Sequence, residues 1–456
     1  MTATNETNQG RSNGLLIFLT LMIFYAFFTN TYLTTNDASR FSMTVSLATG
    51  GGGEITNILP QVISKGWKIK DFAVHDGKIY SDKAPLGSLI AVPVFLAATA
   101  LGFKPPWVIY FVSLLTSGMM AAGTALLIYR LIPIWKRDER LRIVLALAYG
   151  IGGMSLFYGT VFFSSAMTAF CGFSAFYCFA VSPLSKRPAA LAAIGGFLAG
   201  AAILSDYYAA ITAVCVLGYG ILANQKMIIP MILGFAVPIA ILFYYNELVF
   251  GAPWPLSYKY ASLYGSYHAT GFYGVNLPGK DSAARLASIL LAKWGFFFTN
   301  LSVIFSIYAF RKFLALRRES CMIVLMSAGY LLLNSSLSWF DAYSARFFMP
   351  LMPFLILPLA FLDFGNRWVR NAFFFAMGFS ILINLVGADY FLPEFVGEQK
   401  PGMQNLAAII LAPHGIRIGY WNFVFPAILV GLVWLTGFRK RKQLKFQSND
   451  ISAMTN

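Results

Sequence analysis

The sequence predicts an all-α polytopic membrane protein, and two properties of the whole chain and one pattern along it indicate this class. Of the 456 residues, 58% are hydrophobic and 11% are charged, and the mean hydropathy is +0.66. A soluble globule of this size needs more polar surface than this composition provides. Apolar runs of about 20 residues, the length of a helix that crosses a bilayer core, recur along the chain.

The apolar runs predict about twelve transmembrane helices. The first run follows the polar leader 1–13 and has no small-residue cleavage site, so we expect it to remain in the protein as a helix. The predicted spans are 14–33, 107–132, 143–159, 163–182, 188–205, 207–223, 228–250, 286–310, 320–337, 347–363, 372–388 and 420–438.

The segment 86–103 is apolar enough to be a thirteenth span, or it lies in the outer leaflet. In the second arrangement the turns rich in Lys and Arg, such as 136–142 and 311–318, all face one side, as the positive-inside rule requires. The same rule accounts for the net charge of +16 without a nucleic acid partner. We therefore expect cytoplasmic termini in a plasma (inner) membrane and outer segments at 34–106, 251–285, 338–346 and 389–419.

The sequence offers little for a metal or another cofactor. The four cysteines lie in apolar runs without a C-x-x-C pair, which is typical of packing residues. The three histidines, His75, His268 and His414, lie in separate outer segments. We expect loop histidines and no cofactor.

Two clusters in the first outer segment hold candidate site residues. Directly after the first span, Asp37 and Arg40 are three residues apart and would share a face of a short helix. They are either a site or a helix cap with an ordinary interface pair. Further along, Tyr80, Asp82 and Lys83 come just before Pro85 and an apolar segment, at the depth of a lipid-linked phosphate.

These clusters resemble the GT-C superfamily of membrane glycosyltransferases, with the aminoarabinose transferases of lipid A and the protein O-mannosyltransferases (family 39-like) as the nearest groups. The chain has D-x-x-R-[FY] at 37–41 and G-x-x-Y-x-x-K-x-P-L-G at 77–87. It also has Y-N-x-x-x-F-G-x-P at 245–253 and W-x-x-x-x-x-x-R-[FY]-x-x-P at 339–350. The resemblance covers roughly 14–360. It departs from many relatives at Asn36, which replaces a second acid, and at Ser164 and Ser165, where they carry a histidine.

The resemblance implies an inverting, metal-independent transfer of a sugar from a polyprenyl-phosphate donor to a lipid, polysaccharide or protein acceptor at the outer face. Asp37 would be the base, because desolvation near the membrane makes a carboxylate more basic. Arg40 and Lys83 would bind the donor phosphate. The catalytic region would be 1–363, followed by C-terminal helices, the outer loop and a basic tail in 364–456.

Four further residues have two interpretations each. Arg346 contacts the donor phosphate, or it is an interfacial arginine paired with Asp341. Asp206 lines a sugar pocket, or it caps a turn. Tyr258 and Tyr260, in the aromatic loop 251–285, stack on a saccharide, or they lie on lipid headgroups.

A different class of function also fits the composition. The protein would then be a transporter or flippase of a lipid-linked saccharide, or a non-catalytic binder of that lipid. A transporter is expected to have matching halves with interrupted helices, whereas this chain concentrates its charge in one early outer segment. Asp37→Asn separates the classes, because it should abolish transfer and leave transport or binding intact.

Overall fold

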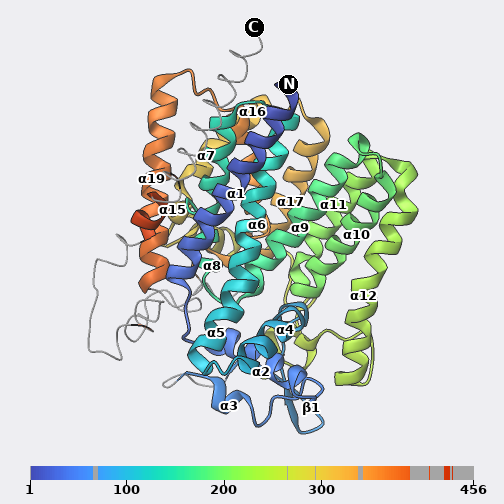
Figure 1. The fold of residues 1–456 in the computed structure, drawn as a ribbon. Helices are drawn as coiled ribbons and strands as arrows, with labels where there is room; N and C mark the ends of the chain where they lie inside the picture. The colour runs from blue at the N-terminus through green and yellow to red at the C-terminus, as the bar shows by residue number, and fades with distance from the viewer. Residues whose placement is uncertain are drawn as a thin grey trace.

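The computed structural model describes residues 2–64, 70–263, 265–292, 294–336, 343–390, 410, 426–431 and 434. Within these residues the protein is a helical bundle whose long helices lie roughly side by side (Figure 1). The helices of the bundle are α1 (Thr2–Phe28), α5 (Pro105–Ser113), α6 (Met119–Leu131), α7 (Glu139–Gly150), α9 (Ser164–Val181), α10 (Pro188–Ser205), α11 (Ala210–Ala223), α12 (Ile228–Phe250), α14 (Ser282–Leu291), α16 (Ile304–Phe313), α17 (Arg317–Ser336), α18 (Met352–Ile356) and α19 (Arg367–Tyr390).

Short elements connect these helices. A π-helical turn, η1 (Leu114–Gly118), joins α5 to α6 in one continuous segment. The short α-helices are α2 (Thr35–Ala48), α3 (Leu59–Val62), α4 (Leu86–Ala100), α8 (Ser155–Tyr158), α13 (Gly265–His268) and α15 (Phe296–Thr299). The 3-10 turns are η2 (Ile132–Ile134), η3 (Ser182–Leu184), η4 (Tyr207–Ala209), η5 (Gln225–Met227), η6 (Ser257–Tyr260), η7 (Leu301–Val303), η8 (Arg346–Phe348) and η9 (Leu357–Phe361).

Five helices among the described residues are long and apolar enough to cross a membrane: Pro105–Ile134, Ser164–Leu184, Pro188–Ser205, Gln225–Phe250 and Arg367–Asp389. A sixth is added if a strongly bent pair counts as one span. The count of twelve spans stays a prediction. Several apolar runs that the sequence presents as single spans are broken in the structure, such as 143–159, which divides into α7 and α8. The predicted span 420–438 and the outer loop 389–419 lie mostly outside the described residues.

The bent pair lies where the sequence predicts one span at 286–310. The helix that ends at Thr299 and the helix that begins at Leu301 meet at an angle of 95°. Asn300, between them, has the non-helical dihedrals φ −127° and ψ 49°. A break of this size exposes backbone groups that must find partners within the protein.

Small residues bring α10 and α12 close together. A Cβ on Gly196 would lie 1.9 Å from the Met231 carbonyl oxygen, and one on Gly234 would lie 1.9 Å from the Ala193 carbonyl oxygen. In a membrane, where lipid is as apolar as the side chains, such close backbone contact stabilises helix pairs. These glycines therefore set the distance between the two helices.

The first outer segment forms one end of the molecule, where α2, α3, α4, α5 and β1 gather, whereas the N-terminus lies at the opposite end (Figure 1). It contains two helices, α2 and α4, where the sequence predicts juxtamembrane helices, and α4 packs against α2 and α5. α4 has 15 residues, about 22 Å of helix, which is shorter than a bilayer core.

An antiparallel hairpin in this segment was not predicted. Its strands are β1 (Ala73–His75) and β2 (Lys78–Tyr80), and Ala73 pairs with Tyr80. Asp76 and Gly77 form the two-residue loop, with φ of 48° and 75°. Because both loop residues have positive φ, the turn matches the twist of the strands. The all-α class is therefore correct for the bundle and incomplete for this segment.

Candidate functional site

The Asp37 side chain lies in the first turn of α2. Thr34, and not Asp37, is the N-cap residue of this helix. The Thr34 hydroxyl donates to Asp37 Oδ1 at 2.8 Å, and the Ala38 N–H donates to the same oxygen at 3.1 Å. Asp37 is only 1% exposed. The alternative in which Asp37 caps the helix is wrong, because Thr34 occupies the N-cap position.

Arg40 lies one turn further along α2 and is also buried. Its Nη2 donates to Ser164 Oγ at 3.0 Å, and Ser164 Oγ donates to Asp206 Oδ2 at 2.9 Å. Its Nε donates to Asn36 Oδ1 at 3.2 Å. Burial lowers the pKa of Arg40, and Asp206 opposes that shift.

The third nitrogen of Arg40, Nη1, is a buried donor without a hydrogen bond among the described residues. A buried donor without a partner is costly, because it has lost its water. This donor therefore marks the place where an anion would be stabilised.

Lys83 is held between two acids. Its Nζ lies 3.1 Å from Asp71 Oδ2 and 3.2 Å from Asp82 Oδ2, and the three side chains are at most 8% exposed. Burial by itself would lower the pKa of Lys83, but Asp71 and Asp82 outweigh it and raise the pKa. Burial also raises the pKa of Asp82, and Lys83 offsets part of that shift. Lys83 thus balances two buried carboxylates.

The hairpin brings Asp71 and Asp82 together. In the hairpin Ala73 pairs with Tyr80. If this register is continued two residues beyond the strands, position 71 lies opposite position 82. Asp71 was not a candidate site residue in the sequence. The Asp76–Gly77 dipeptide between β-branched and aromatic residues is a hairpin signal, and it would have revealed this pairing.

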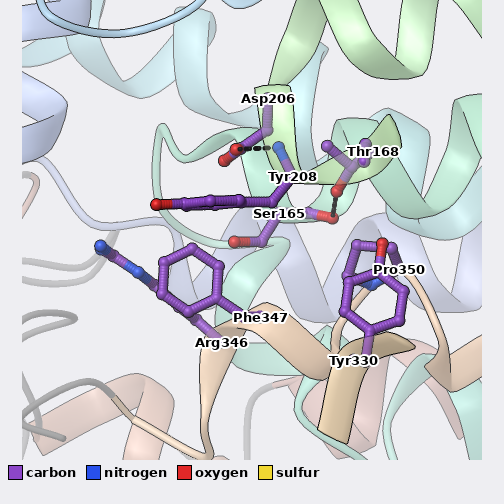
Figure 2. A pocket seen from close by; sticks show the side chains of 9 residues that line it. Ser165, Thr168, Asp206, Tyr208, Tyr330, Arg346, Phe347 and Pro350 are labelled. Carbon is purple, nitrogen blue, oxygen red and sulfur yellow. Dashed lines mark hydrogen bonds between the residues drawn. The ribbon is translucent and has the colours of Figure 1, made fainter. Parts of the chain in front are cut away.

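Arg346 lines a small pocket together with Asp206. The other lining residues in Figure 2 are Ser165, Thr168, Tyr208, Tyr330, Phe347 and Pro350. In Figure 2 the Asp206 carboxylate, the Tyr208 hydroxyl and the Arg346 guanidinium are directed to the same side of the pocket.

The Arg346 guanidinium lies near two aromatic rings, 4.9 Å from the centre of Phe347 and 5.6 Å from that of Phe163. Its charge adds to the lowering of the Arg40 pKa, which burial dominates, and opposes the rise of the Lys83 pKa. Asp341, with which the sequence suggested an ion pair, lies outside the described residues.

Asp206 caps a turn, as one of its two interpretations expected, and it also lines the pocket; its contact with a sugar stays a prediction. Its Oδ1 accepts a hydrogen bond from the Tyr208 N–H at 3.3 Å, which caps η4, and its Oδ2 accepts from Ser164. The carboxylate also lines the pocket. Ser164, which had no assigned role in the sequence, therefore connects Arg40 to the pocket.

The aromatic candidates divide into two groups. Tyr258 packs edge-on against Tyr207, with ring centres 5.1 Å apart, and stacks on His268 at 4.3 Å. Burial lowers the pKa of His268, so the neutral imidazole is favoured there. Tyr258 also influences the pKa of Arg40.

The other group surrounds Phe250. Tyr260 stacks on Phe250 with ring centres 4.7 Å apart, and Tyr80 packs edge-on against the same ring at 6.0 Å. Neither residue lines the pocket of Arg346. Tyr80 and Tyr260 thus both contact Phe250, and their proposed contact with the substrate stays a prediction.

A larger apolar cavity lies next to this pocket. It has a volume of about 560 Å³ and is lined by residues of α16, α17 and the segment after η8, among them Ile307, Phe310, Val324 and Leu351. Phe348, the last residue of η8, lines this cavity, whereas Arg346 and Phe347 line the polar pocket. Likewise, Tyr330 of α17 lines the polar pocket and the next residue, Leu331, lines the apolar cavity. The two spaces are thus neighbours on either side of η8.

Among the described residues, no group of three His, Cys, Asp or Glu side chains could hold a metal ion. His75 packs edge-on against Tyr260, with ring centres 4.8 Å apart. His414 lies outside the described part of the chain.

The comparisons with known proteins gave likenesses only among solved structures. No protein-family model matches the chain, and no curated protein matches it. The crystal structure of the Archaeoglobus fulgidus oligosaccharyltransferase in complex with Zn and sulfate is 14% identical and covers 81% of this chain, with a TM-score of 0.49. The apo form is 13% identical and covers 84%, with a TM-score of 0.45.

A third solved structure is the archaeal oligosaccharyltransferase AglB from Archaeoglobus fulgidus in complex with an inhibitory peptide and a dolichol-phosphate. It is 13% identical and covers 83% of this chain, with a TM-score of 0.42. The matches cover 51% to 57% of these solved chains, so this chain spans about half of their length. Because identity and TM-scores are this low, the assignment of a function rests on the residues of the site.

Proposed function

We propose that the protein is an inverting, metal-independent glycosyltransferase. It moves a sugar from a polyprenyl-phosphate donor to a hydroxyl group of a lipid, glycan or protein at the outer face of the membrane. The proposal is supported by the sequence motifs, which contain the three cations Arg40, Lys83 and Arg346, and by the hydrogen bonds through Ser164 and Asp206 that connect Arg40 to the pocket of Arg346. The cytoplasmic termini and the outer position of the site follow from the charge pattern of the sequence and belong to the proposal.

The observation that carries the proposal is a small pocket lined by Arg346 beside an apolar cavity, with Arg40 connected to the pocket through Ser164 and Asp206. Such a pair of spaces fits an amphiphile with an anionic head and an apolar chain. The cavity volume of about 560 Å³ lies within the range of pockets that hold ligands, and its polar lining side chains are Ser306 and Ser327. We assign the chain of the donor to this cavity and its phosphate to the side of Arg346 and Arg40.

The reaction uses these groups as follows. The acceptor oxygen attacks the anomeric carbon of the sugar from the face opposite the phosphate, so the configuration inverts. The bond from that carbon to the phosphate oxygen breaks, and the electron pair leaves with polyprenyl phosphate. Asp37 takes the proton of the acceptor hydroxyl. Arg40 and Arg346 stabilise the charge that grows on the phosphate.

Lys83 contributes through its charge. Its Nζ already contacts Asp71 and Asp82, so direct contact with the phosphate requires an exchange of partners. We propose that it keeps the two carboxylates from repelling the anion. Tyr258 and Asp206 lie where they would contact the sugar. The pocket has a volume of about 10 Å³, which is room for about one water. A sugar therefore enters only if side chains such as Phe347 move.

Sugar transfer in membranes that contain the wild-type chain tests the proposal. A panel of polyprenyl-phosphate sugars serves as donors, and Asp37→Asn is the variant. Removing a general base should lower the rate about 10²- to 10⁴-fold. Asp76→Asn is the matched control, since this aspartate is in the same outer segment and its side chain is 87% exposed. Donor consumption by the wild type and the control, and its loss in Asp37→Asn, would support the enzyme.

Two outcomes would contradict the proposal. Full activity of Asp37→Asn would remove the proposed base. Binding of labelled polyprenyl phosphate without consumption of any donor would instead favour a non-catalytic binder or a transporter.

A further inference from the structure

The turn before Arg346 has an unusual backbone. Ser344 and Ala345 have φ of 53° and 49°, and both are therefore in the left-handed region. This region is unfavourable for residues that have a Cβ atom, and such strain persists only where surrounding contacts hold it. Arg346 follows directly as the first residue of η8. The direction of its side chain thus depends on what holds this turn.

Several hydrogen bonds from distant segments hold the turn. The Ser344 N–H donates to the Trp294 carbonyl at 3.1 Å, and the Tyr158 hydroxyl donates to the Tyr343 carbonyl at 2.5 Å. Asn300 Nδ2 donates to Ser344 Oγ at 2.9 Å. Thr299 Oγ1 also forms a hydrogen bond with Ser344 Oγ. Substitution of Asn300 removes one of these two side-chain contacts, whereas substitution of Ser344 removes both.

Asn300 connects this turn to two other parts of the bundle. It is the residue at the 95° break between the helices that end at Thr299 and begin at Leu301. Its Nδ2 also donates to the Phe296 carbonyl at 2.8 Å, and its Oδ1 accepts from the Met154 N–H at 2.8 Å. The side chain is fully buried. One amide therefore acts as donor and acceptor at once, which a carboxylate cannot do.

We propose that Asn300 is a positioning residue for Arg346. It acts through Ser344, because its hydrogen bond fixes the strained turn from which Arg346 reaches the pocket. The Asn300 amide at the helix break supplies the donor. The turn that it holds sets the direction of the Arg346 side chain. This inference rests on the proposed function, in which Arg346 binds the donor phosphate, and it assigns Asn300 no contact with the substrate.

Binding of polyprenyl phosphate to the purified full-length protein tests the inference without requiring transfer. Asn300→Asp keeps the shape of the side chain and removes the donor. We expect it to weaken binding about tenfold, and to raise KM for the donor more than it lowers kcat. Ser344→Ala removes the acceptor without adding charge and should weaken binding in the same direction. The matched control is Asn246→Asp, because Asn246 is also fully buried and its Nδ2 donates to a backbone carbonyl, that of Pro253, at 3.1 Å.

A double-mutant cycle with Arg346→Gln separates positioning from general stability. Arg346→Gln alone should weaken binding about 10- to 100-fold, as expected for a hydrogen bond to a charged group. In that background Asn300→Asp should have little further effect, because its action requires Arg346. A purely structural role would give the same loss in both backgrounds and would overturn the inference.

The remaining outcomes are also decisive. If Arg346→Gln weakens binding but both Asn300→Asp and Ser344→Ala bind as the wild type does, the positioning role is refuted and the proposed function is kept. If the wild type does not bind polyprenyl phosphate at all, the proposed donor and this inference fail together. A loss in Asn246→Asp equal to that in Asn300→Asp would show that any buried asparagine has this effect and would refute the specific role.

Discussion

Replacing Lys83 by methionine is expected to destabilise the protein strongly, because it leaves two adjacent carboxylates without their cation. The side chains of Lys83, Asp71 and Asp82 are 8%, 8% and 2% exposed. Removing one partner of a buried ion pair costs about 3 to 5 kcal/mol. The loss should exceed that in Lys78→Met, the matched control. Lys78 contacts Glu54 at 3.0 Å, but the two side chains are 56% and 34% exposed, and water screens such pairs.

Thermal unfolding in detergent, followed with a thiol-reactive fluorophore, measures this difference. Cys171 and Cys178 are buried and free, so their exposure reports unfolding. The variant should have a clearly lower midpoint than the wild type, and Lys78→Met should differ little from it. If Lys83→Met does not accumulate, the triple variant Asp71→Asn, Asp82→Asn and Lys83→Met removes all three charges and should recover stability, since neutral replacement of a buried ion pair is tolerated.

The pH dependence gives a second test of the same charge balance. Burial raises the pKa of Asp82, and Lys83 opposes that rise. In Lys83→Met the folded-state pKa of Asp82 should therefore rise further, so the folded protein binds more protons than the unfolded chain and stability should rise as the pH falls from about 7 to about 5. In the wild type the pKa of Lys83 is raised, so its contribution is present at neutral pH and is lost only as the pH rises through the folded-state value. A midpoint of Lys83→Met equal to that of Lys78→Met, or one that falls further on acidification, would refute this reasoning.

Three further predictions concern the bundle, the turn before η8 and the chemistry. Gly196→Ala should cost about 1 to 3 kcal/mol, because the new Cβ meets the α12 backbone. Gly218→Ala in α11 meets nothing within 4 Å and should gain up to about 1 kcal/mol. Equal unfolding midpoints would contradict this. Ala345→Gly should cost little stability, because relief of a left-handed penalty of about 1 to 2 kcal/mol offsets the added freedom of the unfolded chain. It should nevertheless raise KM for the donor, because the turn no longer holds Arg346 in one direction. An unchanged KM would show that this turn does not position Arg346. Finally, transfer should survive EDTA because the arginines supply the positive charge, and loss of transfer that added Mg²⁺ or Mn²⁺ restores would refute the metal-independent mechanism.

Local sequence patterns predicted the class of the protein and part of the site. Hydropathy indicated a helical membrane protein, and the charged residues after the first span predicted juxtamembrane structure, which α2 and α4 provide. Asp37 and Arg40, three residues apart, share one buried helix. Lys83 precedes an apolar helix, as its position before Pro85 indicated. These features depend on residues within a few turns of one another, so a short window of sequence contains the needed information.

The tertiary structure decided which residues meet. Ser164 lies 124 positions from Arg40 in the chain and 42 from Asp206, yet its hydroxyl contacts both. Asn300 reaches Ser344 across 44 positions and Met154 across 146. The broken helix at Asn300 appeared in the sequence as one apolar run, because hydropathy does not record where buried polar groups find partners. The sequence by itself determined that the chain is apolar enough for a membrane and where its charges are concentrated. The fold decided which charges are neutralised, since burial and the distance to a partner depend on segments far apart in the chain.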